Sequence, residues 1–150
     1  MDARAVAIAA GVDVLTLNTW VSRGQIPGMK IGARGRRRDF DVETATKVAV
    51  IAQLTKIGLG APQAASIVAN LKAPFYKRLL IVIDETQARI DLVQGRRAPP
   101  PLLFFDYSSD DTLQTIQNML EQPTLFVIVD VATLEQRMRK AQEIWDHGIR

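Results

Sequence analysis

The segment Val12–Phe40 constrains the fold more than any other part of this chain. A short stretch lies between two glycines, Gly11 and Gly24, and a glycine-rich segment loaded with arginine follows it. Glycine adopts the left-handed backbone conformation that ends a helix and turns the chain, so a helix is predicted before each of these glycines. Asp13 is a suitable N-cap for the second helix. The chain is therefore predicted to begin with two short helices joined by a tight turn.

Helical spacing gives the second predicted helix two different faces. Its apolar face should pack on the first helix and consists of Val14, Leu17, Trp20 and Val21. The opposite face is short, polar and exposed, which fits a helix inserted into a DNA major groove but also fits an ordinary surface helix. This outward face consists of Leu15, Thr16, Asn18, Thr19, Ser22 and Arg23.

A small hairpin is predicted after Gly24, because the apolar residues Ile26 and Phe40 flank a glycine-rich middle. Basic residues crowd this region, and no acidic residue lies among them between positions 22 and 38. They are Arg23, Lys30, Arg34, Arg36, Arg37 and Arg38.

The positive charge of the chain is concentrated at one end. Residues 1–40 carry seven basic and three acidic side chains, a net charge of +4, while residues 41–150 carry twelve and thirteen, a net charge of −1. Basic side chains placed against phosphates release counterions and gain affinity. A solvated loop is the alternative explanation, but the two helices before the basic segment favour nucleic acid.

Two further helices are predicted after the hairpin, one capped by Asp41 and running to about Ile57, and one opened by Pro62 and running through Leu71. The first should bury a single apolar stripe, made of Val42, Ala45, Val48, Ala49 and Ala52. Pro74 marks a domain boundary.

Residues 74–150 predict a small α/β domain with a three- to four-stranded sheet and two helices. Strand candidates are 79–83, 89–93, 102–107 and 125–129, and helices are predicted at 110–122 and after residue 130. Because 125–129 is apolar at every position, it is predicted to lie in the middle of a covered sheet. The last helix carries a seam that could pack on this sheet or pair with a second subunit, made of Val131, Leu134, Met138, Ala141 and Trp145.

Several function classes are disfavoured by composition. The chain has no cysteine and a single histidine, His147, which removes thiolate metal sites and leaves little for histidine catalysis. No run of 18 apolar residues and no signal peptide is found, so an intracellular protein with no membrane contact is expected. Asp106, Asp110 and Asp111 would suit a magnesium or phosphoryl site, but helix capping is the stronger explanation, and no enzyme activity or cofactor is predicted.

Residues 5–71 resemble the winged helix-turn-helix domain of MerR-type transcription regulators and, in shorter form, excisionase-like DNA-binding proteins. The resemblance is carried by Gly11 and Val12 at the turn, by Trp20 with the segment 23–27 (RGQIP), and by the basic segment 30–38. It implies a homodimer on a near-palindromic operator. Asn18 and Thr19 depart from the family, which commonly has an arginine and an aromatic residue there, and no long dimerisation helix follows Leu71 directly.

The sequence therefore predicts an α+β protein with a winged helix-turn-helix DNA-binding domain at 1–73 and a domain for dimerisation, partner binding or effector sensing at 74–150. The expected function is a sequence-specific, cytoplasmic, nucleoid-associated transcription regulator of a bacterium or phage, binding double-stranded DNA. The alternatives are an excisionase-like DNA bender and a protein-interaction module localised to DNA by its basic half. The predicted DNA-binding residues are Thr16, Asn18, Thr19, Arg23, Lys30, Arg34, Arg36, Arg37 and Arg38.

Overall fold

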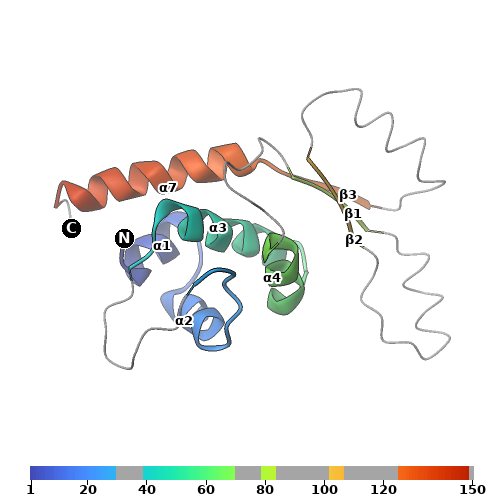
Figure 1. Ribbon diagram of the computed structural model, residues 1–150, viewed down its shortest axis with the longest axis horizontal. Helices are drawn as coiled ribbons and strands as arrows, with labels where there is room; N and C mark the ends of the chain where they lie inside the picture. Colours follow the sequence, from blue (N-terminus) through green and yellow to red (C-terminus); the bar gives the residue numbers. More distant parts are fainter. Residues whose placement is uncertain (30–38, 70–78, 84–101, 107–124, 149–150) are drawn as a thin grey trace. The chain divides into compact units, whose positions relative to one another are not determined.

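The computed structural model describes residues 1–29, 39–69, 79–83, 102–106 and 125–148 (Figure 1). The chain divides into two units. The first, a helical unit, is made of Met1–Phe75 together with Val131–Arg150, and the second is Tyr76–Asp130. The C-terminal helix belongs to the first unit and not to the unit of the strands that precede it, while the division into domains at 1–73 and 74–150 stays a prediction.

The described helices of the first unit begin and end close to where the sequence predicts. They are α1 (Ala3–Ala10), α2 (Val14–Ser22), α3 (Val42–Lys56), α4 (Ala61–Ala69) and α7 (Val131–Asp146). None of them is by itself long and apolar enough to cross a membrane, and the bent pair of α1 and α2 meets that test by length and composition alone.

The turn between α1 and α2 is built on Gly11. Its φ of 70° is left-handed, and its N–H and that of Val12 donate to carbonyl oxygens of the last turn of α1, at 3.1 Å to Ile8 and 3.0 Å to Ala7. Asp13 then caps α2 by accepting from the Leu15 N–H at 2.6 Å. The two helices are bent by 112° to each other, which is within the range of helix-turn-helix motifs.

The helix α3 is buried on more sides than the sequence predicts. Ala45, Val48, Ala49 and Ala52 of the expected stripe are buried, but so are Thr46, Val50, Ile51 and Leu54. The prediction of one apolar face was therefore too narrow. The reason is that α1, α4 and α7 all pack against α3, and a helix covered by three neighbours has little solvent-facing surface left.

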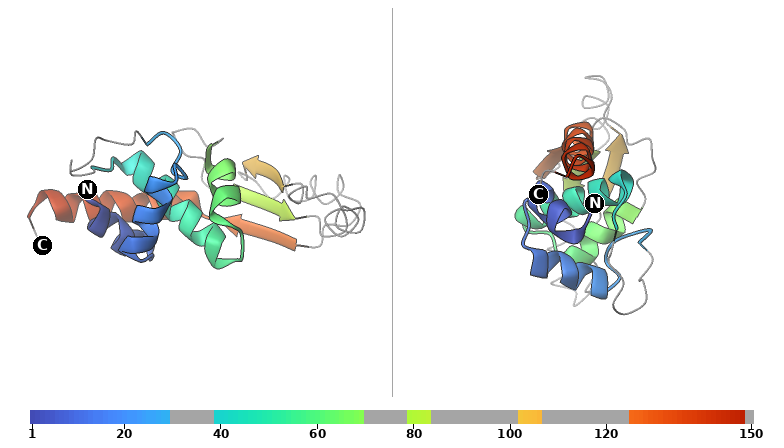
Figure 2. Two further views of the ribbon diagram at one scale, coloured as in Figure 1. Left: turned by 90° about the horizontal axis from the view of Figure 1, so that it is seen from below. Right: turned by 90° about the vertical axis from the view of Figure 1, so that its left-hand side faces the viewer.

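The helix α7 supplies one of these neighbours. Val131, Leu134 and Met138 of the predicted seam are buried, and the helix contacts α1 and α3 of the same chain. The prediction that this seam packs on the sheet was therefore wrong, while pairing with a second subunit stays a prediction. Figures 1 and 2 show α7 and α2 on opposite sides of the layer formed by α1 and α3.

The second unit contains three described strands, β1 (Leu79–Ile83), β2 (Leu102–Asp106) and β3 (Leu125–Val129). They form an antiparallel sheet in the order β2-β1-β3, with Ile81 opposite both Phe104 and Val127. The prediction that 125–129 is a central strand was wrong for these strands, because β1 is equally apolar and takes the middle place. The predicted strand 89–93 and helix 110–122 lie outside the described residues, so the α/β character of this unit stays a prediction.

We predict that Met138→Ala destabilises the helical unit by about 2–5 kcal/mol, because it opens a cavity where a fully buried side chain of α7 meets its neighbours. Urea unfolding followed by Trp20 fluorescence, in a Trp145→Phe background, measures the unit that contains α2. Arg137→Ala, at the preceding exposed position, is the control. If Met138→Ala left the urea midpoint measured by Trp20 fluorescence unchanged, α7 would not be part of this unit.

We predict that Gly11→Ala destabilises the same unit by about 1–2 kcal/mol, since alanine pays the cost of the left-handed conformation. A Cβ at this position would also approach Lys56 Nζ to 3.1 Å, although a lysine end group moves easily. Gly11→Asn should cost less despite its larger side chain, because asparagine tolerates this conformation better. The same urea assay tests both variants, and a larger loss for asparagine than for alanine would contradict the conformational explanation.

Candidate nucleic-acid interface

The outward face of α2 is the centre of the candidate interface. Leu17, Trp20 and Val21 are buried and turn the helix so that the opposite residues face solvent. The exposed ones are Leu15, Thr16, Thr19, Ser22 and the adjoining Arg23. The two faces predicted from helical spacing are thereby confirmed, with the qualification that Val14 is only half-buried.

Asn18 differs from the other predicted DNA-binding residues of α2. It is half-buried rather than exposed, and it takes part in a polar or electrostatic interaction within the chain. Helical spacing places Asn18 at the border between the two faces, where small shifts of the helix decide exposure. A contact between Asn18 and a base therefore competes with its interaction inside the protein.

The C-terminal end of α2 brings a positive charge to the interface. Arg23 is the C-cap residue and is exposed, and Gly24 follows in the left-handed conformation with a φ of 66°. The Gln25 N–H donates to the Trp20 carbonyl at 2.8 Å and closes the helix end. A cation is favourable there, because the carbonyl end of a helix carries partial negative charge.

The arginine-rich segment begins and ends at buried residues. Lys30, Arg34, Arg36, Arg37 and Arg38 lie outside the described residues, so the hairpin and its contacts stay predictions. Before the segment, Ile26 is buried, and after it Phe40 is buried. Phe40 exchanges two backbone hydrogen bonds with Met1, at 2.8 and 3.0 Å. The basic segment therefore leaves and rejoins the helical unit at anchored positions.

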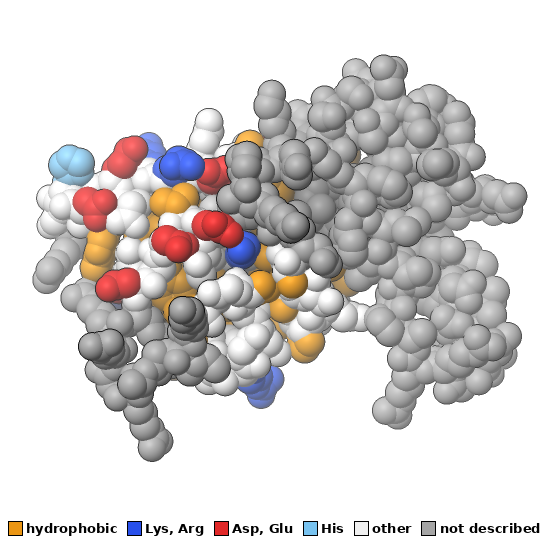
Figure 3. Space-filling model, in the orientation of Figure 1, with side chains coloured by type: hydrophobic (Ala, Val, Ile, Leu, Met, Phe, Trp, Pro, Cys, Tyr) orange, Lys and Arg blue, Asp and Glu red, His pale blue; other side chains and the backbone are white. Residues whose placement is uncertain are grey.

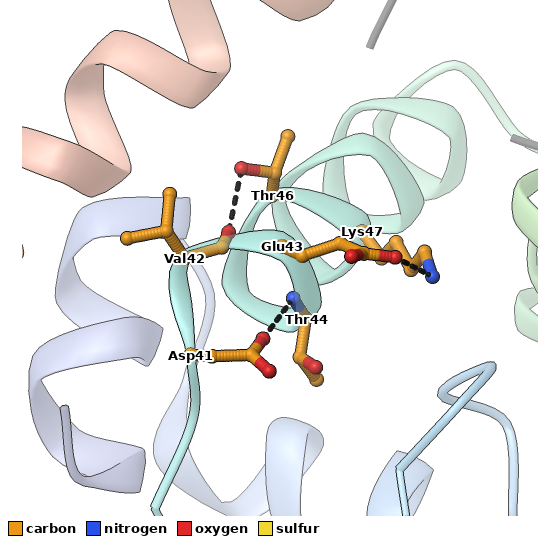
Figure 4. A network of polar contacts seen from close by, with 6 residues as sticks. All are labelled: Asp41, Val42, Glu43, Thr44, Thr46 and Lys47. Carbon is orange, nitrogen blue, oxygen red and sulfur yellow. Dashed lines mark hydrogen bonds and ion pairs between the residues drawn. The ribbon is translucent and has the colours of Figure 1, made fainter. Parts of the chain in front are cut away.

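The start of α3 is held by a set of short-range polar contacts (Figure 4). Asp41 accepts from the Thr44 N–H at 2.7 Å, and the buried Thr46 hydroxyl donates to the Val42 carbonyl at 2.8 Å. Glu43 pairs with Lys47 at 2.6 Å, one helical turn apart. These contacts define where the chain leaves the basic segment and enters α3.

Sequence reasoning missed two lysines of α3 that lie close to Gly28 and Gly11. A Cβ at Gly28 would lie 3.8 Å from Lys47 Nζ, and one at Gly11 would lie 3.1 Å from Lys56 Nζ. The Lys47 side chain is only 12% exposed, whereas Lys56 is exposed. Both lysines are far from these glycines in the sequence, so local sequence patterns could not predict that they lie close together. Lys56 adds positive charge near the turn, whereas the charge of Lys47 is balanced by its ion pair with Glu43.

On the face of the helical unit drawn in Figure 3, acidic and basic side chains are interspersed over α7, and another basic side chain lies at the lower edge. The side chains of Asp106, Asp110 and Asp111, the alternative site for a metal ion, lie outside the part of the chain that the structure describes. No group of three acidic or histidine side chains that could hold a metal occurs among the described residues.

Comparison with known families agrees with this geometry. Residues 1–71 match the family described as MerR HTH family regulatory protein. No curated protein matches the chain. The matched range includes the α1–α2 pair, the basic segment, α3 and α4. Residues 1–71 are therefore a MerR-like helix-turn-helix segment, the kind of element with which transcription regulators bind DNA.

Proposed function

We propose that this protein is a sequence-specific DNA-binding transcription regulator whose helix α2 enters the major groove. The observation that carries the proposal is the helix pair bent by 112°, which presents an exposed, uncharged face of α2 directly beside Arg23. A helix in the major groove reads base edges through its outward side chains. Among the exposed polar residues of α2, Thr16 and Thr19 are proposed for this contact, with the half-buried Asn18 beside them.

The basic residues are proposed to bind the phosphate backbone or the minor groove. Arg23 is exposed beside the outward face of α2, and the segment with Lys30 and Arg34–Arg38 follows within a few residues. Phosphate contacts position a protein on DNA but carry no sequence information. Affinity is thus assigned to the basic residues, and sequence choice to α2.

We infer further that the protein acts as a homodimer, since helix-turn-helix proteins commonly bind two half-sites about 34 Å apart through two-fold symmetry. Val131, Leu134 and Met138 of α7 are buried inside the chain, so they are not proposed as the dimer surface. The unit Tyr76–Asp130 is proposed for dimerisation, for a partner protein or for an effector. Its described sheet has β2 and β3 at the edges, and edge strands offer backbone groups to another chain. The proposal involves no catalytic step and places the protein in the cytoplasm, on the nucleoid.

We predict that Arg23→Ala and Arg36→Ala each weaken binding to all DNA sequences and reduce the slope of log affinity against log salt by about 0.9, because each removes one phosphate contact. Fluorescence anisotropy with a labelled duplex over a salt series measures both quantities. Arg137→Ala is the matched control, because it removes an exposed arginine from α7, on the side of the unit away from α2. Binding that does not depend on salt would contradict the proposed phosphate contacts. An absence of binding would contradict the proposed DNA-binding function.

We predict that light scattering on the full-length chain gives a mass of twice 16.6 kDa. The expectation follows from the two-fold symmetry proposed for the operator complex. A dilution series controls for nonspecific association, because a specific dimer dissociates to a monomer and forms no larger species. A mass of 16.6 kDa at every concentration, with or without DNA, would rule out the homodimer.

A further inference from the structure

The outward face of α2 is uncharged and rich in methyl and hydroxyl groups. Leu15 is 77% exposed, and Thr16, Thr19 and Ser22 are exposed around it. From Val14 to Ser22 the helix contains no lysine, arginine, aspartate or glutamate. Its exposed residues offer the methyl groups of leucine and threonine and hydroxyl oxygens, with the half-buried Asn18 at the border.

Two of these hydroxyl groups already donate hydrogen bonds to carbonyl oxygens of α2. The Thr19 hydroxyl donates to the Leu15 carbonyl at 2.8 Å, and the Ser22 hydroxyl donates to the Thr19 carbonyl at 2.9 Å. Each hydroxyl has one proton, so towards a ligand these two oxygens serve as acceptors. The face therefore combines acceptor oxygens and methyl groups, with few hydrogen-bond donors.

The base pairs of DNA differ in what they require from such a face. Guanine presents two acceptors in the major groove, O6 and N7, and is read by donors, above all by arginine and lysine. Thymine presents its C5-methyl group, which is read by apolar contact, while adenine N6 and cytosine N4 both offer a donor to an acceptor oxygen. Asn18, where it reaches a base, also pairs with adenine. The acceptor oxygens do not distinguish adenine from cytosine, so the preference for A·T pairs rests on the exposed methyl groups, which match thymine, and on the lack of charged donors for guanine.

We propose that α2 selects A·T base pairs, with the Leu15 side chain packed against the C5-methyl group of a thymine. This inference rests on the proposed function, because it assumes that α2 lies in the major groove. Covering a leucine that is so exposed in the free protein lowers the free energy of the complex, because its apolar surface is removed from water. Arg23, which follows the helix as its C-cap, remains a phosphate contact.

The test begins with selection of a binding site from a random DNA pool by the full-length protein. Each thymine of that site is then replaced by uracil, which lacks only the methyl group, and each guanine by 7-deazaguanine, which lacks the N7 acceptor. At one or more thymines, uracil should weaken binding by about fourfold, as expected for the loss of one buried methyl contact. Deazaguanine should have little effect at positions facing α2.

Leu15→Ala connects this effect to the side chain. The variant should bind the thymine and uracil duplexes equally, because the partner of the methyl group is gone. Ile144→Ala is the control, since it shortens an exposed apolar residue of α7, on the side away from α2, and should keep the full thymine preference. Circular dichroism confirms that both variants fold, as expected for exposed positions.

The outcomes separate this inference from the function on which it rests. A selected site that binds tightly but tolerates uracil everywhere, or that loses affinity with deazaguanine instead, overturns the inference and leaves DNA binding intact. Unchanged thymine preference in Leu15→Ala overturns the assignment to Leu15. A selection that returns no site overturns the proposed function and the inference together.

Discussion

Burial of α3 is the constraint on which the described helical unit depends. Val48, Ile51 and Leu54 have no exposed surface, because α1, α4 and α7 cover the helix from different sides. The helix α1 packs on α3 and also on α2, so the position of α2 is determined through α1. The start of α3 also ends the basic segment, at the Asp41 cap. A single buried helix thus links the turn, the helix proposed to read DNA and one end of the arginine-rich segment.

The proposed interface separates affinity from sequence choice. Charge–phosphate attraction acts on every DNA sequence alike, and the chain supplies it through Arg23 and the segment that follows. Selection needs directional or close contacts with base edges, and the uncharged face around Leu15 and Thr19 has that character. Because Arg23 directly follows α2, the proposed docking of that helix would bring this arginine to the DNA as well.

Local signals explain why the ends and the two faces of α2 could be predicted from the sequence. A cap such as Asp13, a helix stop such as Gly11 and the alternation of buried and exposed positions in α2 depend on residues within one or two turns. The partial burial of Asn18 could not be predicted in this way, because it depends on how α2 packs against the rest of the unit. Lys47 and Lys56 were missed for a related reason, since they approach Gly28 and Gly11 only after α3 has docked.

The sequence by itself determined the helix-turn-helix pair, the ends of the described helices and the position of the basic segment, because each follows from short-range backbone preference and charge. Tertiary structure alone decided that α7 returns to α1 and α3, that α3 is buried on several sides, and that β1 rather than β3 is central among the described strands. An apolar seam or strand indicates that a surface will be buried. Hydrophobic contact is non-directional, however, so the pattern does not specify which element will cover that surface. The partner is selected by which elements come together when the whole chain packs.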